Sequence, residues 1–178
     1  MVSLTFFFFF LVLIFVVIGA MRGWAKELLV TFSVVLSIFI ITVLERYVPA
    51  VYNSIAQPGS TSQFWLRSLI VVVLIFFGYQ TPNLPRIGGA RFARERLQDS
   101  LLGAFLGALN GFIIVGTLWL YLHQAGYPYK YITPPVAGTE MGDAALRLLP
   151  WLAPRWLSPP TIYFAVGLSF LFLIVVFI

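Results

Sequence analysis

Five apolar stretches, each close to the length that crosses a lipid bilayer, constrain this chain more than any other feature. Together they take up about half of its 178 residues. A membrane-spanning helix needs about 20 mostly apolar residues, and about 17 are tolerated. With 61% hydrophobic and only 10% charged residues, a water-soluble fold would lack the polar side chains that cover a surface. The stretches are Leu4–Ala20, Leu28–Leu44, Phe64–Tyr79, Ser100–Leu122 and Thr161–Ile178.

This pattern predicts an all-α integral membrane protein with about five transmembrane helices and a short interfacial helix. We expect three parts and no separate soluble domain: a four-helix membrane core over residues 1–124, an outer loop over 125–160 and a fifth transmembrane helix over 161–178. In the loop, apolar residues recur at helical spacing between Thr139, a good helix cap, and Pro150. This short helix is expected to lie along the membrane surface, with the two tryptophans that follow it at head-group depth.

The basic residues predict how the chain lies in the membrane. Six of the 11 lysines and arginines lie in two short connections on one side. The other five lie on the opposite side, four of them in longer connections and Arg67 just inside the third stretch. Short basic connections usually stay in the cytoplasm, so we expect the N terminus outside and the C terminus inside. The net charge of +5 then reflects topology and anionic lipid head groups rather than nucleic acid. The six residues are Arg22, Lys26, Arg86, Arg91, Arg94 and Arg96.

The residue types argue against enzyme chemistry. The chain has no cysteine, which excludes disulfides, thiol catalysis and cysteine-bound metals. It also has no recognisable carboxylate pair, nucleophile–base pair or phosphate-binding glycine loop, so we expect neither an enzyme nor a metal site. The single histidine, His123, follows the fourth stretch and could ligate a haem or chlorophyll. An interfacial histidine that caps the helix end is the preferred interpretation.

The fourth stretch carries the sharpest pattern. Gly103, Gly107 and Gly111 repeat at a spacing of four, which places them on one face of a helix. In lipid, small residues let two backbones approach closely, and this packing supplies much of the association between helices. Asn110 lies beside the same face at membrane depth, where its amide needs a partner on another helix. We interpret this stretch as the central packing helix, and an Asn110 that lines a cavity or path is the alternative.

The connection between the first two stretches is short and also carries a recognisable pattern. Gly23 allows a tight turn, and Glu27 falls in the first turn of the second helix, where a carboxylate faces the positive helix end. Because the connection is short, we expect the two helices to be antiparallel neighbours.

Arg67 lies only three residues inside the third stretch, so it must reach the head groups or pair with a partner.

Two motifs on these helices resemble a known family. The segment Arg22–Glu27 reads RGWAKE and resembles the RGxxxE segment of the colicin V production protein (CvpA) family. The segment Asp99–Gly103 reads DSLLG and, with the glycines that follow it, is similar to the second signature of that family. The resemblance covers roughly residues 4–124, and family members often carry arginine where this chain has Asn110. The motif residues are Arg22, Gly23, Glu27, Asp99, Leu102 and Gly103.

The resemblance implies a bacterial inner-membrane protein linked to colicin V export and envelope homeostasis, without an established chemical activity. We therefore expect a non-catalytic protein that acts through helix packing, with the lipid bilayer, other membrane subunits or further copies of itself as partners. Two alternatives stay open. One is an accessory or assembly subunit of a larger respiratory or photosynthetic complex, with a pigment, haem or quinone at a subunit interface. The other is a pore or transport component that forms after oligomerisation.

Overall fold

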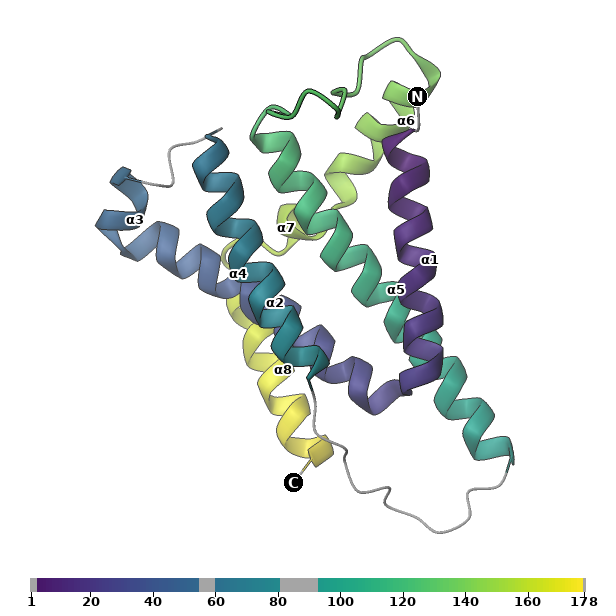
Figure 1. Ribbon diagram of the computed structural model, residues 1–178. Coiled ribbons are helices and arrows are strands. Elements are labelled where there is room, and N and C mark those ends of the chain that lie inside the picture. Colours follow the sequence, from purple (N-terminus) through teal and green to yellow (C-terminus); the bar gives the residue numbers. More distant parts are fainter. Residues whose placement is uncertain (1–2, 55–59, 81–92, 178) are drawn as a thin grey trace.

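The computed structural model describes residues 3–54, 60–80 and 93–177, which form helices and turns without any strand. Figure 1 shows their arrangement. The long helices are α1 (Leu4–Arg22), α2 (Trp24–Tyr47), α4 (Thr61–Tyr79), α5 (Ala93–Gln124) and α8 (Thr161–Phe177). The short elements are α3 (Pro49–Ser54), α6 (Glu140–Leu148), the 3-10 turn η1 (Leu149–Trp151) and α7 (Ala153–Trp156).

Four helices, α1, α2, α4 and α5, are long and apolar enough to cross a membrane, and α8 is a shorter apolar helix. The prediction of an all-α membrane protein is therefore confirmed. Helix α4 begins at Thr61, three residues before the apolar stretch that predicted it. Ser60 caps this helix, because its hydroxyl accepts a hydrogen bond from the Gln63 N–H at 3.1 Å. The extra turn brings α4 to 19 residues, enough for a complete span.

Helix α5 is the centre of the fold and contacts α1, α2, α4 and α7. Its two ends lie at opposite ends of the bundle (Figure 1). We call the end where α1 begins and α2 finishes the Tyr47 end, and we call the opposite one, where α1 turns into α2, the Gly23 end. Helix α5 begins at the Gly23 end and finishes at the Tyr47 end.

Helices α1 and α2 are separated by Gly23 alone, yet they diverge from it (Figure 1). The expectation that they are antiparallel neighbours is wrong along most of their length. Helix α1 packs along α5, whereas α2 packs against α4, α5 and α8. The side chains explain the difference, because Gly19 of α1 lies too close to α5 for any side chain, while the face of α2 carries branched residues that fill a core.

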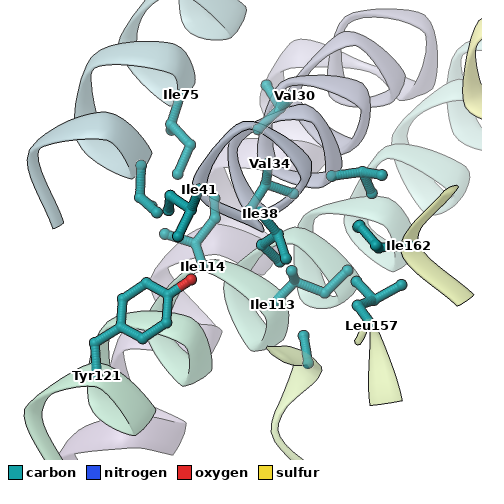
Figure 2. Packing of buried hydrophobic residues seen from close by; sticks show 13 residues of the cluster. Val30, Val34, Ile38, Ile41, Ile75, Ile113, Ile114, Tyr121, Leu157 and Ile162 are labelled. Carbon is teal, nitrogen blue, oxygen red and sulfur yellow. The ribbon is translucent and has the colours of Figure 1, made fainter. Parts of the chain in front are cut away.

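Two buried clusters surround α5. The larger lies between α2, α4, α5 and the start of α8, and Figure 2 shows its branched side chains packed together. Val30, Val34 and Val71 are completely covered there. The smaller cluster lies between α1, α5 and the α6–α7 segment, around Phe8 and Leu120. Close packing on both sides fixes the helices that carry the polar groups of the candidate site.

The chain after α5 folds back over the bundle. Helix α6 is capped by Thr139, whose hydroxyl accepts a first-turn N–H, and it packs against α1, while α7 packs against α5. Helix α8 then runs antiparallel to α2. The ring centroids of Phe39 and Tyr163 are 6.1 Å apart, and those of Phe32 and Phe170 are 4.7 Å apart. The other face of α8 is exposed and apolar.

Candidate functional site

Gly23 forms the turn on which the candidate site is built. It is at once the C-cap of α1 and the N-cap of α2, with a φ of +84° that L side chains rarely adopt. The space beside it is also closed, because a Cβ at this position would lie 2.7 Å from Oδ1 of Asp99. Both the backbone angle and the neighbouring carboxylate therefore require glycine here.

The start of α5 fastens this turn with two hydrogen bonds. The Trp24 N–H donates to Oδ1 of Asp99 at 3.2 Å, and this supplies the N terminus of α2 with a partner that no local side chain provides. The Ser100 hydroxyl donates to the Ala20 carbonyl oxygen at 3.0 Å. Thus Asp99 and Ser100 hold both sides of the turn.

Three glycines of α5, Gly103, Gly107 and Gly111, follow these bonds along the helix and lie directly against α1. We call them the glycine row. A Cβ on Gly107 would overlap the Phe15 carbonyl oxygen and lie 3.0 Å from the Gly19 Cα, and one on Gly103 would overlap the Gly19 carbonyl oxygen. A Cβ on Gly111 would lie 2.7 Å from the Phe15 Cβ. The partner is backbone rather than flexible side chain at two of the three positions. These two helices can therefore approach this closely only with glycine there.

Arg22, the last residue of α1, joins three helices. Its Nη1 donates to Oε1 of Glu27 on α2 at 2.8 Å, and its Nη2 donates to the Tyr79 carbonyl oxygen of α4 at 3.3 Å. The guanidinium also lies 4.3 Å from the centroid of the Tyr79 ring. A cation at the C-terminal end of a helix is stabilised by the exposed carbonyl groups, and a cation over an aromatic ring is attracted to its face.

Glu27 is completely buried and its carboxylate is held from two sides. Arg22 binds Oε1, and Nδ2 of Asn110 donates to Oε2 at 2.9 Å. The same Nδ2 donates to the Glu27 carbonyl oxygen at 2.9 Å, and the Thr31 hydroxyl donates to Oδ1 of Asn110 at 2.7 Å. The amide of Asn110 is thereby engaged at both its nitrogen and its oxygen. A carboxylate buried in this way is tolerable because its charge is paired and hydrogen-bonded.

The arrangement at the Gly23 end is suited to holding helices, because the polar groups of Arg22, Glu27 and Asn110 are occupied by one another and by neighbouring backbone. We call this set the Gly23 junction. Among the residues that the structure describes, no group of three histidine or acidic side chains is placed to hold a metal ion. The members of the Gly23 junction are Gly19, Arg22, Gly23, Glu27, Thr31, Tyr79, Asp99, Ser100, Gly103, Gly107 and Asn110.

Not every residue singled out in the sequence lies in the junction. Leu102 belongs to the second motif, but its side chain is 52% exposed and faces away. His123 lies near the Tyr47 end, where its ring packs edge-on against Tyr127 with centroids 5.7 Å apart, and its Nδ1 is buried without a hydrogen-bond partner. Arg86 and Arg91 lie outside the described residues, as does the side chain of Arg94.

A second polar cluster, which we call the Arg67 clamp, lies at the Tyr47 end. Arg67 of α4 donates from Nε to Oε1 of Glu45 at 2.6 Å and from Nη2 to Oε2 at 2.8 Å. Its Nη1 donates to Oε1 of Gln124 at 2.5 Å, and the guanidinium lies 5.0 Å from the centroid of the Tyr121 ring. Arg67 thus pairs with a partner, as its place inside the apolar stretch predicted, and it joins α4 to α2 and α5.

Several members of these clusters were not predicted from the sequence. Gly19 is the most important, because it is the surface of α1 that meets the glycine row. Its signal was the spacing of four that separates it from Gly23. Thr31 had a similar signal, since it follows Glu27 by four residues and so shares its face. Glu45 and Gln124 had no local signal, because only the fold brings them to Arg67.

The profile of the colicin V production protein family matches residues 4–133 of the chain. The match includes α1, α2, α4 and α5, and with them every member of the Gly23 junction and the Arg67 clamp. The segment from α6 to α8 lies beyond it. Neither a curated protein nor a solved structure matches the chain.

Proposed function

The chain belongs to the colicin V production protein family, and from this premise we propose that it is a non-catalytic protein of the inner membrane that works by holding its helices in a fixed arrangement. The Gly23 junction is the part of the chain that does this work. It joins the end of α1, the start of α2, the end of α4 and α5 at a single place. The process it serves is the export of colicin V and the maintenance of the cell envelope.

One observation carries this proposal. The two family motifs meet in the fold, where the carboxylate of Asp99 lies against Gly23 and accepts the N–H of Trp24. The motif residue Glu27 has 0% exposure and its two carboxylate oxygens are bonded to Arg22 and Asn110. A group that transfers protons or binds substrate must reach the reacting atoms, whereas these groups reach one another. Their arrangement supports a packing role.

The proposed orientation has the Gly23 end in the cytoplasm and the Tyr47 end outside. Support comes from Lys26 and Arg96 together with Arg22, all of which lie at the Gly23 end. The absence of cysteine makes a direct assay simple, because any introduced thiol is the only one. A cysteine at Thr133, which is exposed, should react with an impermeant maleimide added outside intact spheroplasts.

The packing role is tested with Gly107→Leu and a matched control, Gly167→Leu. At Gly107 a side chain would overlap the backbone of α1, whereas a Cβ on Gly167 of α8 has no neighbour within 4 Å. Each variant is expressed in a bacterium that lacks its own family member. The amount of folded protein in the membrane and the production of colicin V are then measured. We expect Gly107→Leu to lower both together, and Gly167→Leu to leave both unchanged.

A non-catalytic scaffold also predicts a relation across many variants. Colicin V production should follow the amount of folded protein, whichever junction residue is changed. A variant of Glu27 or Asp99 that reaches the normal folded amount and still abolishes production would contradict the proposal, because it would separate chemistry from packing. If Gly107→Leu folds in normal amount and supports normal production of colicin V, the glycine row has no role in packing.

A further inference from the structure

The segment between α6 and α8 lies deeper in the bundle than a surface loop would. Leu152 and Ala153 are both completely buried. A Cβ added to Gly116 of α5 would lie 3.0 Å from a methyl group of Leu152 and 3.6 Å from the ring of Phe8 on α1. Figure 1 accordingly shows α7 beside the body of α5 rather than beyond its end.

The depth of this segment can be measured along three helices, α5, α1 and α2. Gly116 precedes Gln124, the last residue of α5, by eight residues, which is about 12 Å along the axis at about 1.5 Å per residue. Phe8 follows Leu4, the first residue of α1, by four residues, or about 6 Å. Measured from these helix ends, Leu152 lies about 6 to 12 Å deep, which is within the outer half of a hydrocarbon layer that is about 30 Å thick.

The third measurement is made along α2 and locates the start of α8. The first turn of α8 lies beside Phe39, because the rings of Phe39 and Tyr163 are 6.1 Å apart. Phe39 precedes Tyr47, the last residue of α2, by eight residues, again about 12 Å along the axis. Helix α8 therefore begins inside the span of α2 rather than level with its end. This explains how a helix of 17 residues can still extend to the Gly23 end.

We propose that Leu149–Pro160 is a re-entrant membrane segment, which enters the bilayer at the Tyr47 end and contacts phospholipid through Trp151 and Trp156. The side chains of these tryptophans are 70% and 47% exposed. Tryptophan favours the boundary between acyl chains and head groups, where its ring is apolar and its N–H is polar. The inference goes beyond the proposed function and concerns residues outside the family match.

The backbone of the segment is adapted to an apolar solvent. In lipid, an unpaired N–H or C=O group costs several kcal/mol, so irregular backbone must satisfy itself or avoid donors. Four prolines remove donors altogether, at positions 150, 154, 159 and 160. Among the residues that keep an N–H, Leu152, Arg155 and Leu157 donate it to carbonyl oxygens of the same segment at 3.3, 2.9 and 2.8 Å. The Trp156 indole N–H donates to the Trp151 carbonyl oxygen at 3.1 Å.

The exposed charge of Arg155 fits the same placement. Its guanidinium is close enough to His123, in the last turn of α5, for its charge to act on the imidazole. The backbone of Arg155 lies in α7, and its side chain is exposed. A long arginine stem that carries its charge to the head groups is the usual arrangement at this depth.

The test uses single cysteines in the naturally cysteine-free chain, reconstituted in liposomes of phosphatidylcholine and phosphatidylglycerol. Ser158→Cys and Thr161→Cys are the test positions, and Thr133→Cys is the control. All three side chains are exposed to solvent when lipid is left out of account. If the segment is re-entrant, an impermeant maleimide should label the test positions at least about tenfold more slowly, because an apolar environment raises the thiol pKa and excludes the reagent.

Spin labels at the same positions provide an independent readout. At Ser158→Cys and Thr161→Cys we expect strong relaxation by oxygen, which dissolves in lipid, and weak relaxation by a water-soluble nickel chelate. Thr133→Cys should show the reverse. Labelling and nickel accessibility equal to those of Thr133→Cys would overturn the proposal. Shielding of the test positions from both reagents would overturn it too, because protein rather than lipid would then cover the segment.

Discussion

The Gly23 junction and the Arg67 clamp are both built on an arginine–glutamate ion pair, with N–O distances of 2.8 and 2.6 Å. They differ in their surroundings. At the junction the glutamate side chain is 0% exposed, whereas at the clamp it is 21% exposed. The arginines are similar, at 18% and 15%. Pairing distance alone therefore does not define the role of an ion pair, because water or head groups can replace a lost partner at the clamp but not at the junction.

The backbone packing differs as well. At the junction, α1 and α5 approach so closely that Gly19 and Gly107 could not carry a side chain. At the clamp, three helices are joined by the long side chains of Arg67, Glu45 and Gln124. Long side chains adjust their rotamers when a helix moves, whereas backbone contacts do not. The junction is therefore the rigid end of the bundle.

Removal of the junction arginine should have the largest effect. Arg22→Ala would leave the carboxylate of Glu27 buried without its countercharge, so we expect the free energy of unfolding to fall by about 3–5 kcal/mol. Reversible unfolding in mixed lipid–detergent micelles measures this change. The double variant Arg22→Ala/Glu27→Ala is the control. It should recover part of the loss, and a double variant that is less stable than Arg22→Ala would contradict the account.

Asn110→Ala should have the second largest effect, because it tests a buried hydrogen bond of the junction. It removes the donor to Oε2 of Glu27 and leaves the Thr31 hydroxyl without its acceptor on α5. Cross-helix bonds of this kind in membranes contribute about 1–2 kcal/mol at most, and we expect a loss of that size under the same conditions. Gln124→Ala, which removes the corresponding amide of the clamp, is the matched variant and should cost less. Equal losses of stability in Asn110→Ala and Gln124→Ala would show that burial does not distinguish the junction from the clamp.

Arg67→Ala should have the smallest effect of the three. Glu45 is partly exposed, so water and lipid head groups can solvate its carboxylate once the guanidinium is removed. We expect a loss of about 1 kcal/mol, typical of an ion pair that solvent can reach. A loss as large as that of Arg22→Ala would show that the clamp holds the bundle as firmly as the junction does, and would contradict the difference between the two ends.

Much of this architecture could be predicted from the sequence, because hydrophobic length and small-residue spacing are local signals. The apolar stretches identified the helices, and the turn at Gly23 followed from a glycine between two spans. The face occupied by Gly103 and Gly107 was also readable, since it depends only on helical periodicity. These features need no knowledge of what lies on the other side of a contact.

The partners of those faces could not be predicted, because they depend on where distant helices meet. Asn110 bonds to Glu27, which lies 83 residues earlier, and no local pattern connects the two. A short connection suggested that α1 packs on α2, but tertiary contact with the glycine row of α5 outweighs adjacency in the chain. The depth of the α6–α8 segment was hidden for the same reason, since it depends on Leu152 meeting Gly116.

Cross-linking in native membranes can show directly whether α1 and α5 meet at the Gly23 junction. The Ser100 hydroxyl lies 3.0 Å from the Ala20 carbonyl oxygen, whereas Leu101 is 61% exposed and faces away. The pair Ala20→Cys/Ser100→Cys should form a disulfide on mild oxidation, and Ala20→Cys/Leu101→Cys should not, because disulfides require Cα atoms within about 7 Å and converging side chains. Equal cross-linking of both pairs, or none in the first, would contradict the account.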